Sequence, residues 1–254
     1  KKKKKDKKKR IKAIIATDYG GNPCKWKQLK KIAKKNKIKL INDNCHAVGS
    51  KYENSKMYAI KYADIVTHSF HPVKNITTGE GGAVLTNNKK IFEKIMSLRT
   101  HGVVRKKNNS SPWHYEMKSL GFNYRLSDLQ CALGISQLKK LNKFIKKRNQ
   151  IASIYSRHFI NNKIFKIQKI EKNNQSGYHL FALLINFKKI KINKKQLFRI
   201  LLKKKINLQV HYIPIYKQPF YKKKFNYKPK DFPNAENFYK NQISLPIFYD
   251  LKIM

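Results

Sequence analysis

Two short apolar runs flank an amphipathic segment near the start of the sequence, and this arrangement constrains the fold most strongly. The apolar runs are Lys12–Asp18 (KAIIATD) and Ile38–Ile41, and Cys24–Lys35 between them carries apolar residues at helical spacing. A strand, a helix and a second strand within about thirty residues are typical of a parallel βαβ unit. Further apolar runs at Ala63–Phe70 and Gly82–Thr86 extend the predicted sheet. The predicted fold class is therefore α/β, with a mostly parallel sheet.

The sequence after Lys90 changes in character and predicts a second region. Leucines at helical spacing in Leu126–Phe159 predict one long helix. Shorter segments then alternate between strand and helix patterns, which is typical of a smaller α/β domain. We therefore predict a large domain over residues 1–150 and a small domain over residues 151–254. The predicted elements of the small domain are a strand at Leu180–Asn186, a helix at Lys194–Lys205 and a strand at Leu208–Tyr212.

The charge of the chain suggests one class of partner. There are 59 basic and 13 acidic residues, which gives a formal net charge of +46. Such a charge predicts salt-sensitive sticking to polyanions and keeps a basic nucleic-acid-binding protein as an alternative. Only 7 of the basic residues are arginine, the side chain that reads bases best, and the lysines are scattered along the chain. We therefore predict no specific nucleic-acid partner, and we interpret Lys1–Lys9 as a solvated charge run.

Apolar runs and cysteines indicate the compartment. The longest mostly apolar run, His179–Phe187, is far shorter than the ~20 residues of a membrane-spanning helix. The three cysteines, Cys24, Cys45 and Cys131, are odd in number and far apart, so they form neither a disulfide framework nor a zinc motif. We predict a cytoplasmic protein without a membrane partner.

The candidate chemistry is concentrated within forty residues of the predicted sheet region. Asp43 and His46 follow the second predicted strand, and Ser69, Lys74 and the glycine-rich run Gly79–Gly82 follow the third. In a parallel sheet, ligands bind beyond the carboxyl ends of the strands, which is where these groups are expected.

Each group alone has a plainer interpretation. An aspartate after a strand is most often a turn residue, and a glycine run is often a tight turn. The run at Gly79–Gly82 leads into a predicted strand, whereas nucleotide-binding glycines follow a strand and open a helix. His68 and His71 have no third ligand at a suitable spacing, so we predict no metal site.

Together, the groups meet the needs of pyridoxal 5′-phosphate (PLP). This cofactor needs a lysine amine for a Schiff base and a carboxylate that keeps its ring nitrogen protonated. It also needs small hydroxyl or backbone donors for its phosphate. Asp43, then Ser69 and Lys74, supply these groups in order along the chain.

Longer motifs resemble one family. The sequence resembles the DegT/StrS-type sugar aminotransferases of the fold-type I PLP superfamily over nearly its whole length after residue 12. This resemblance implies a partial large PLP-binding domain followed by a smaller, C-terminal α/β domain. The motifs that carry it are DNCHAVG, SFHPVKNITTGEGGAVLTN, RTHG, GFNYRLSDLQCALGISQL, VHYIPIY and SLP.

The resemblance also implies roles for single residues. Lys74 would form the Schiff base and then carry the proton at the amine-bearing carbon. Related sugar dehydratases have histidine at that position, so the lysine favours transamination. The implied roles of the others are as follows: Asp43 pairs with the ring nitrogen, His46 lies near the ring, Ser69 binds the phosphate, Asn123 reaches the phosphate in the neighbouring subunit, and Arg125 and His211 contact substrate or the subunit interface. For Asn123, a turn-forming asparagine before a helix is the alternative.

The implied reaction moves an amino group from L-glutamate to a UDP-linked 4-keto-6-deoxy sugar, for surface-polysaccharide or flagellin-glycan synthesis, in a homodimer. We expect burial and surrounding positive charge to lower the pKa of Lys74, so that its amine is neutral. Family members begin with a further segment and end with a further helix. We therefore expect this chain to be part of a longer protein, to expose apolar sheet edges and to bind PLP poorly by itself. A non-catalytic fragment of the same fold stays an alternative.

Overall fold

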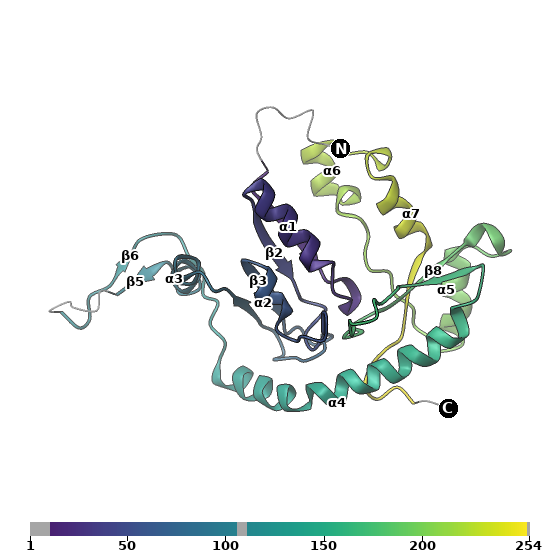
Figure 1. Ribbon diagram of the computed structural model, residues 1–254, viewed down its shortest axis with the longest axis horizontal. Coiled ribbons are helices and arrows are strands. Elements are labelled where there is room, and N and C mark those ends of the chain that lie inside the picture. Colours follow the sequence, from purple (N-terminus) through teal and green to yellow (C-terminus); the bar gives the residue numbers. More distant parts are fainter. Residues whose placement is uncertain (1–10, 106–110, 253–254) are drawn as a thin grey trace.

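The computed structural model describes residues 11–105 and 111–252 and confirms the predicted α/β class (Figure 1). The lysine run Lys1–Lys9 lies outside the described residues. The N-terminal half forms a four-stranded sheet in the order β1-β2-β3-β4. The first three strands are parallel and β4 is antiparallel to β3. The strands are β1 (Ala13–Thr17), β2 (Lys39–Asp43), β3 (Ile65–Ser69) and β4 (Gly82–Leu85).

The predicted βαβ unit is confirmed, with α1 (Trp26–Asn36) between β1 and β2. Trp26 and Ala33, two turns apart on one face of α1, are buried against the sheet residues Leu40 and Val66. A short helix, α2 (Tyr58–Tyr62), packs on the same core. Burial of apolar side chains on one face of α1 is what holds this helix on the sheet.

A buried carboxylate fixes the connection between β1 and α1. Asp18 is fully buried and accepts hydrogen bonds from the backbone N–H of Cys24 at 2.7 Å and from the indole N–H of Trp26 at 3.0 Å. The Tyr58 hydroxyl at 2.8 Å and the Asn44 amide at 2.9 Å also donate to it. Burial raises the pKa of Asp18, against the opposing effect of the Cys24, Tyr58 and Asn44 donors. The cluster therefore ties the ends of β1 and β2 to α1 and α2.

Beyond β4, the chain forms an arm that projects away from the sheet (Figure 1). It contains α3 (Lys89–Leu98) and a two-stranded ribbon of β5 (Val103–Val104) and β6 (Glu116–Met117). The Asn88 side chain caps α3 by accepting from the N–H of Ile91.

One long helix, α4 (Asp128–Phe159), connects the two halves of the molecule. Its start is fixed by a capping box, in which Ser127 and Gln130 each bond the other's backbone N–H. In Figure 1 it runs from the side of the arm to the C-terminal strands. The helix is continuous through residue 150, and the domain boundary placed there stays a prediction.

The C-terminal half is a three-stranded antiparallel sheet with helices around it. Its order is β7-β8-β9, and Phe181, Leu183 and Ile243 lie in its cores. The predicted strand over Leu208–Tyr212 is wrong, because Gln209 alone bridges to Ser244 and the His211 N–H bonds the Gln242 side chain. The elements are β7 (Phe165–Ile167), β8 (Phe181–Ile185), β9 (Gln242–Leu245), α5 (Lys194–Lys203), α6 (Pro219–Phe225) and α7 (Pro233–Asn241), and the 3-10 helices of the chain are η2 (Tyr19–Gly21), η3 (Phe187–Lys189), η4 (Ile215–Lys217) and η5 (Pro229–Asp231).

Within residues 11–105 and 111–252, no helix combines the length and the apolar character that a membrane crossing requires. All three cysteines are free thiols, as the sequence predicted.

Candidate active site

Asp43 is the last residue of β2, so its carboxylate lies at the carboxyl end of the parallel strands. One oxygen accepts from the Thr17 hydroxyl at 3.3 Å, and the other accepts from the Cys45 N–H at 3.2 Å. These bonds come from the end of β1 and from the turn after β2. The carboxylate is thus oriented by its own sheet, and it stays partly exposed.

Lys74 lies in the loop between β3 and β4, and its side chain is partly buried. Its backbone N–H donates to His71, and the next residue, Asn75, anchors the loop by donating to Val48 at 3.0 Å. Burial lowers the pKa of Lys74, whereas the charges of Cys45 and Asp43 raise it. The predicted direction is confirmed, but the predicted help from surrounding positive charge is wrong, since the charges that act on the amine oppose the shift.

His46 is buried three residues beyond Asp43 and contacts both halves of the molecule. Its Nδ1 accepts from the Gly20 N–H at 3.3 Å, and its Nε2 lies 3.4 Å from the Tyr212 hydroxyl. Its ring centroid is 4.4 Å from that of His179. Burial, followed by the charge of Lys74, lowers the pKa of His46 to about 4, against an opposing effect of Asp43. This side chain is therefore a neutral imidazole at physiological pH.

His211 reaches the same place from the C-terminal half. Its Nδ1 lies 2.8 Å from the Ser244 hydroxyl, and its carbonyl accepts from the Tyr19 hydroxyl at 2.7 Å. Burial and the charge of Lys74 both lower its pKa. Electrostatic coupling to Lys74 thus links four of the predicted residues, which are Asp43, His46, Lys74 and His211.

Ser69 ends β3 and lies opposite Gly82 of β4 in the ladder. It is partly buried, and its Oγ accepts from the His71 N–H at 3.4 Å, in the loop that leads to Lys74. Ser69 thus borders the loop that carries Lys74, and in its hydrogen bond to His71 its hydroxyl is the acceptor.

Asn123 and Arg125 lie elsewhere, on the exposed stretch between the arm and α4. The backbone of Asn123 bridges to Thr100 of the arm. Among the contacts of the described chain, none joins either residue to Lys74 or Asp43. The structure therefore does not bring these two predicted residues to the others within one chain.

Sequence reasoning missed Tyr212, His179 and Tyr19, which surround His46. Tyr212 is the neighbour of His211 in the VHYIPIY motif, and that proximity was the one available signal. The His46–Tyr212 contact joins residues 166 positions apart, so local patterns do not reveal it.

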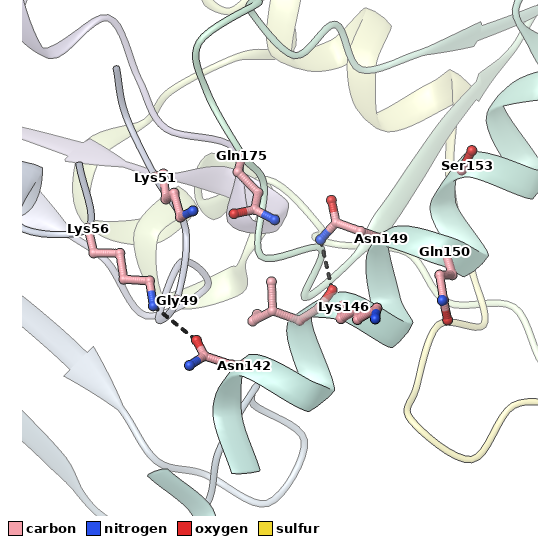
Figure 2. A pocket seen from close by; sticks show the side chains of 10 residues that line it. Gly49, Lys51, Lys56, Asn142, Lys146, Asn149, Gln150, Ser153 and Gln175 are labelled. Atoms are coloured by element: carbon pink, nitrogen blue, oxygen red, sulfur yellow. Dashed lines mark hydrogen bonds between the residues drawn. The ribbon is translucent and has the colours of Figure 1, made fainter. Parts of the chain in front are cut away.

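A separate hollow lies on another face, between the turn after His46 and α4. Figure 2 shows its lining, with the Lys56 ammonium donating to the Asn142 side chain at 2.9 Å. Its volume is about 450 Å³, and its lining includes neither Lys74 nor Asp43. The lining residues are Gly49, Lys51, Lys56, Asn142, Ile145, Lys146, Asn149, Gln150, Ser153 and Gln175.

The site combines a partly buried lysine of lowered pKa, a carboxylate at a strand end and a hydroxyl on the lysine's loop. This donor set fits PLP, since it offers a nucleophilic amine, an anion for the ring nitrogen and a donor for phosphate. Within the described part of the chain, no group of three or more His, Cys, Asp or Glu side chains is placed to hold a metal ion.

The α/β fold is consistent with that of the fold-type I PLP-dependent transferases. Residues 4–253 match the model of the DegT/DnrJ/EryC1/StrS aminotransferase family, and the chain belongs to that family.

Similar proteins agree with this assignment. The chain is 44% identical over 243 residues to the UDP-4-amino-4,6-dideoxy-N-acetyl-beta-L-altrosamine transaminase of Campylobacter jejuni, covering 96% of this chain and 62% of the relative. It matches the structure of Helicobacter pylori PseC, an aminotransferase involved in the biosynthesis of pseudoaminic acid, with a TM-score of 0.85 and 38% identity. That match covers 95% of this chain and 63% of PseC.

The fold is also shared with Spr1654 of Streptococcus pneumoniae, provisionally assigned as a sugar aminotransferase and solved in its PLP form. That match has a TM-score of 0.83 and 24% identity, and it covers 95% of this chain and 64% of Spr1654. The chain thus spans somewhat less than two thirds of the length of these relatives.

Proposed function

We propose that this chain carries the cofactor-binding centre of a PLP-dependent aminotransferase. The observation that carries the proposal is the electrostatic interaction between the Lys74 amine, whose pKa is lowered by burial, and the Asp43 carboxylate at a strand end. The proposed reaction transfers an amino group from L-glutamate to a UDP-linked 4-keto-6-deoxy sugar. The names of the Campylobacter jejuni and Helicobacter pylori relatives support this substrate class.

In this proposal, the chain's own residues bind, orient and move protons. When bound, PLP supplies an electron sink for the carbon that carries the amine. Lys74 would hold the cofactor through its Nζ, and the same amine would then carry the proton at that carbon. Asp43 keeps the ring nitrogen protonated, and the Thr17 and Cys45 donors hold its oxygens in place. Ser69 donates to the phosphate.

Neutral His46 and His211 line the proposed site. Because the pKa of each is lowered, neither adds positive charge beside the Lys74 amine at pH 7. We propose that His46 borders the cofactor ring and that His211 contacts substrate. The support for His211 is its coupling to Lys74 across the two halves of the chain.

We further propose that the protein is a homodimer in which Asn123 reaches the cofactor phosphate of the neighbouring subunit and Arg125 contacts substrate or the interface. Both side chains are exposed and lie away from Lys74 in their own chain. Exposed apolar residues lie on the arm, on the stretch that carries Asn123 and Arg125, and on the first half of α4, and a second copy would bury them. These residues are Trp113, Leu120, Phe122, Tyr124, Leu129, Leu133, Ile135 and Leu138.

The proposed setting is the cytoplasm, in the synthesis of surface-polysaccharide or flagellin-glycan sugars. Free thiols at Cys24, Cys45 and Cys131 support a reducing compartment. Nucleotide sugars are soluble small-molecule substrates, so the proposal needs no membrane partner and no nucleic acid.

The test is covalent labelling of the full chain with PLP, followed by borohydride reduction and peptide mass spectrometry. The chain has 59 basic residues of which 7 are arginine, leaving 59 − 7 = 52 lysines, so unspecific labelling is expected and the peptide must be identified. Because the chain is expected to bind PLP poorly by itself, labelling at limiting PLP should be incomplete, but the label should concentrate on Lys74 and give visible absorbance that Lys74→Ala removes.

Lys31→Ala is the matched control, because Lys31 is exposed on α1. It should leave both the absorbance and the Lys74 label unchanged. Equal labelling of Lys74 and surface lysines would refute the proposed centre.

A further inference from the structure

The hydrogen bonds of His46 show which of its two ring nitrogens carries the proton when the ring is neutral. The Gly20 N–H is a donor, so the Nδ1 that accepts from it at 3.3 Å carries no proton. The ring is neutral, because burial lowers its pKa to about 4. A neutral imidazole has one N–H, and here it must be on Nε2. The Nε2–H then donates to the Tyr212 oxygen, 3.4 Å away.

The Gly20 donor is held by the fold. Gly20 is buried in η2 with φ of +66°, a conformation that favours glycine. The neighbouring Asp18 is fixed by its four donors, and its carbonyl accepts from the Gly21 N–H at 3.0 Å. The backbone that aims at His46 is therefore set by the buried cluster at the end of β1.

His179 packs against the His46 ring and is itself held neutral. Its ring is buried 4.4 Å from the His46 ring, and burial lowers its pKa to about 2, with the charges of His46 and Lys74 acting in the same direction. Two buried rings in contact with each other and coupled to an ammonium resist protonation of either one. His46 thus stays neutral across the physiological pH range, and the Gly20 N–H sets which of its nitrogens carries the proton.

Tyr212 is the exposed end of this chain of donors. Its side chain is 57% exposed, whereas His46 is 7% exposed. Its oxygen already receives the His46 proton, so the hydroxyl proton is free to be donated outward. The charge of Asp43 acts on Tyr212 and raises its pKa, as burial does, so the hydroxyl keeps its proton.

We propose that Tyr212 is a positioning residue whose hydroxyl, oriented by the Nε2-protonated tautomer of His46, donates a hydrogen bond to an acceptor oxygen of the ligand bound beside Asp43 and Lys74. The inference rests on the proposed function for the identity of that ligand. The acceptor oxygen belongs to the cofactor or to the amino-acid substrate, and the experiment separates these two sources.

The first measurement concerns the full chain without ligand. Long-range ¹⁵N–¹H spectra of histidine-labelled protein should show His46 with Nδ1 unprotonated and Nε2 protonated at pH 7, assigned by loss of the signals in His46→Gln. Tyr212→Phe should leave this tautomer unchanged, because Gly20 sets it. A His46 protonated on Nδ1 overturns the inference.

The second measurement uses two His46 variants. One keeps a group at the position of Nε2, which contacts Tyr212, and the other keeps a group at the position of Nδ1, which contacts Gly20. His46→Gln places an amide N–H near the position of Nε2 and keeps a donor for Tyr212. His46→Asn places its amide near Nδ1 and cannot reach Tyr212. Pyridoxamine 5′-phosphate, which does not attach to Lys74, is the probe for the cofactor arm, and the KM for L-glutamate against kcat is the readout for the substrate arm.

Tyr212→Phe and His46→Asn should each change one of the two readouts by about tenfold, either as weaker binding of pyridoxamine 5′-phosphate or as a higher KM for L-glutamate. This is the size expected for the loss of one hydrogen bond to a charged group. The double variant should be no weaker than either single variant, and His46→Gln should lose less. Tyr221→Phe, on α6, is the matched control and should change neither the binding of pyridoxamine 5′-phosphate nor the KM for L-glutamate. Unchanged values for Tyr212→Phe in both arms overturn the proposal, as does a wild-type chain that binds neither probe.

These outcomes are distinguishable from failure of the proposed function. If Lys74 is labelled by PLP while His46 is protonated on Nδ1, the function stands and this inference is wrong. If the tautomer and the pyridoxamine phosphate arm behave as expected while Lys74 is not labelled, this inference stands and the transaminase proposal is wrong.

Discussion

The carboxyl end of the four-stranded sheet and the arm with the start of α4 differ in how complete they are. At the sheet end, Asp43, His46 and His211 each have hydrogen-bond partners from within the chain. On the arm and the first turns of α4, Leu120 is 81% exposed and Leu129 is 85% exposed. Contacts within one chain therefore organise the sheet end, whereas the arm and the start of α4 keep apolar side chains exposed.

This difference explains the split among the predicted site residues. Asp43, His46 and Lys74 follow β2 and β3 and are electrostatically coupled, because the carboxyl ends of parallel strands share one edge of the sheet. Asn123 and Arg125 lie on the uncovered surface, so any role at the cofactor requires a second chain. We expect substitutions at the sheet end to change the chemistry and substitutions on the arm or the start of α4 to change self-association.

The largest effect is expected at Asp43. Asp43→Asn keeps an acceptor oxygen for Thr17 or Cys45 but removes the negative charge, so amine transfer from L-glutamate should fall by about 1,000-fold, as for loss of a preorganised electrostatic partner. The rate of the glutamate half-reaction in PLP-loaded protein is the measurement. Asp250→Asn, at an exposed position, should leave the rate unchanged. A comparable rate in both variants would remove the carboxylate from the chemistry.

The next effect concerns assembly. Leu129→Asp should weaken self-association by about 100-fold, because a symmetric dimer carries the substitution twice and each leucine loses roughly 1.5 kcal/mol of apolar burial. Sedimentation velocity over a concentration series measures this shift. Leu202→Asp is the matched control, since Leu202 is 63% exposed on α5, away from the arm. A wild-type chain that is monomeric at every concentration would break the comparison between the two regions.

Much of the fold could be predicted because its determinants are local. The apolar run KAIIATD contains β1, and the apolar spacing that predicts α1 lies within the helix itself. The capping pair Ser127 and Gln130 likewise marks the start of α4 within four residues. The failure at Leu208–Tyr212 has the opposite cause, since a side chain of β9 takes the backbone N–H of His211.

The site divides in the same way. Asp43, His46 and Lys74 lie on one continuous stretch, and family motifs include them. Tyr212 and His179 join that stretch only through tertiary contacts, so periodicity and motif spacing say nothing about their contacts with His46. The direction of the Lys74 pKa shift follows from burial, while the sign of the neighbouring charges required coordinates.

The smallest effect of a single substitution is expected on a pH dependence of stability that comes from the two buried histidines. The pKa is about 4 for His46 and about 2 for His179, against 6.5 for the free side chain. Below pH 6.5 the unfolded chain binds these protons and the folded chain does not, so stability is lost as the pH falls. Each histidine should lower the folding equilibrium constant by up to about tenfold per pH unit between 6.5 and its folded pKa.

Urea unfolding at pH 7 and pH 5 measures the loss, and His179→Gln should reduce it because one of the two groups no longer titrates. His114→Gln is the matched control, since His114 is exposed on the arm and should not alter the pH dependence. If both variants behave like the wild-type chain, the buried pair does not resist protonation. The neutral imidazoles would then not distinguish the sheet end from the arm. Retained pH dependence in His114→Gln and reduced dependence in His179→Gln would tie the neutral imidazoles to the self-organised region, where they stay uncharged beside the Lys74 amine.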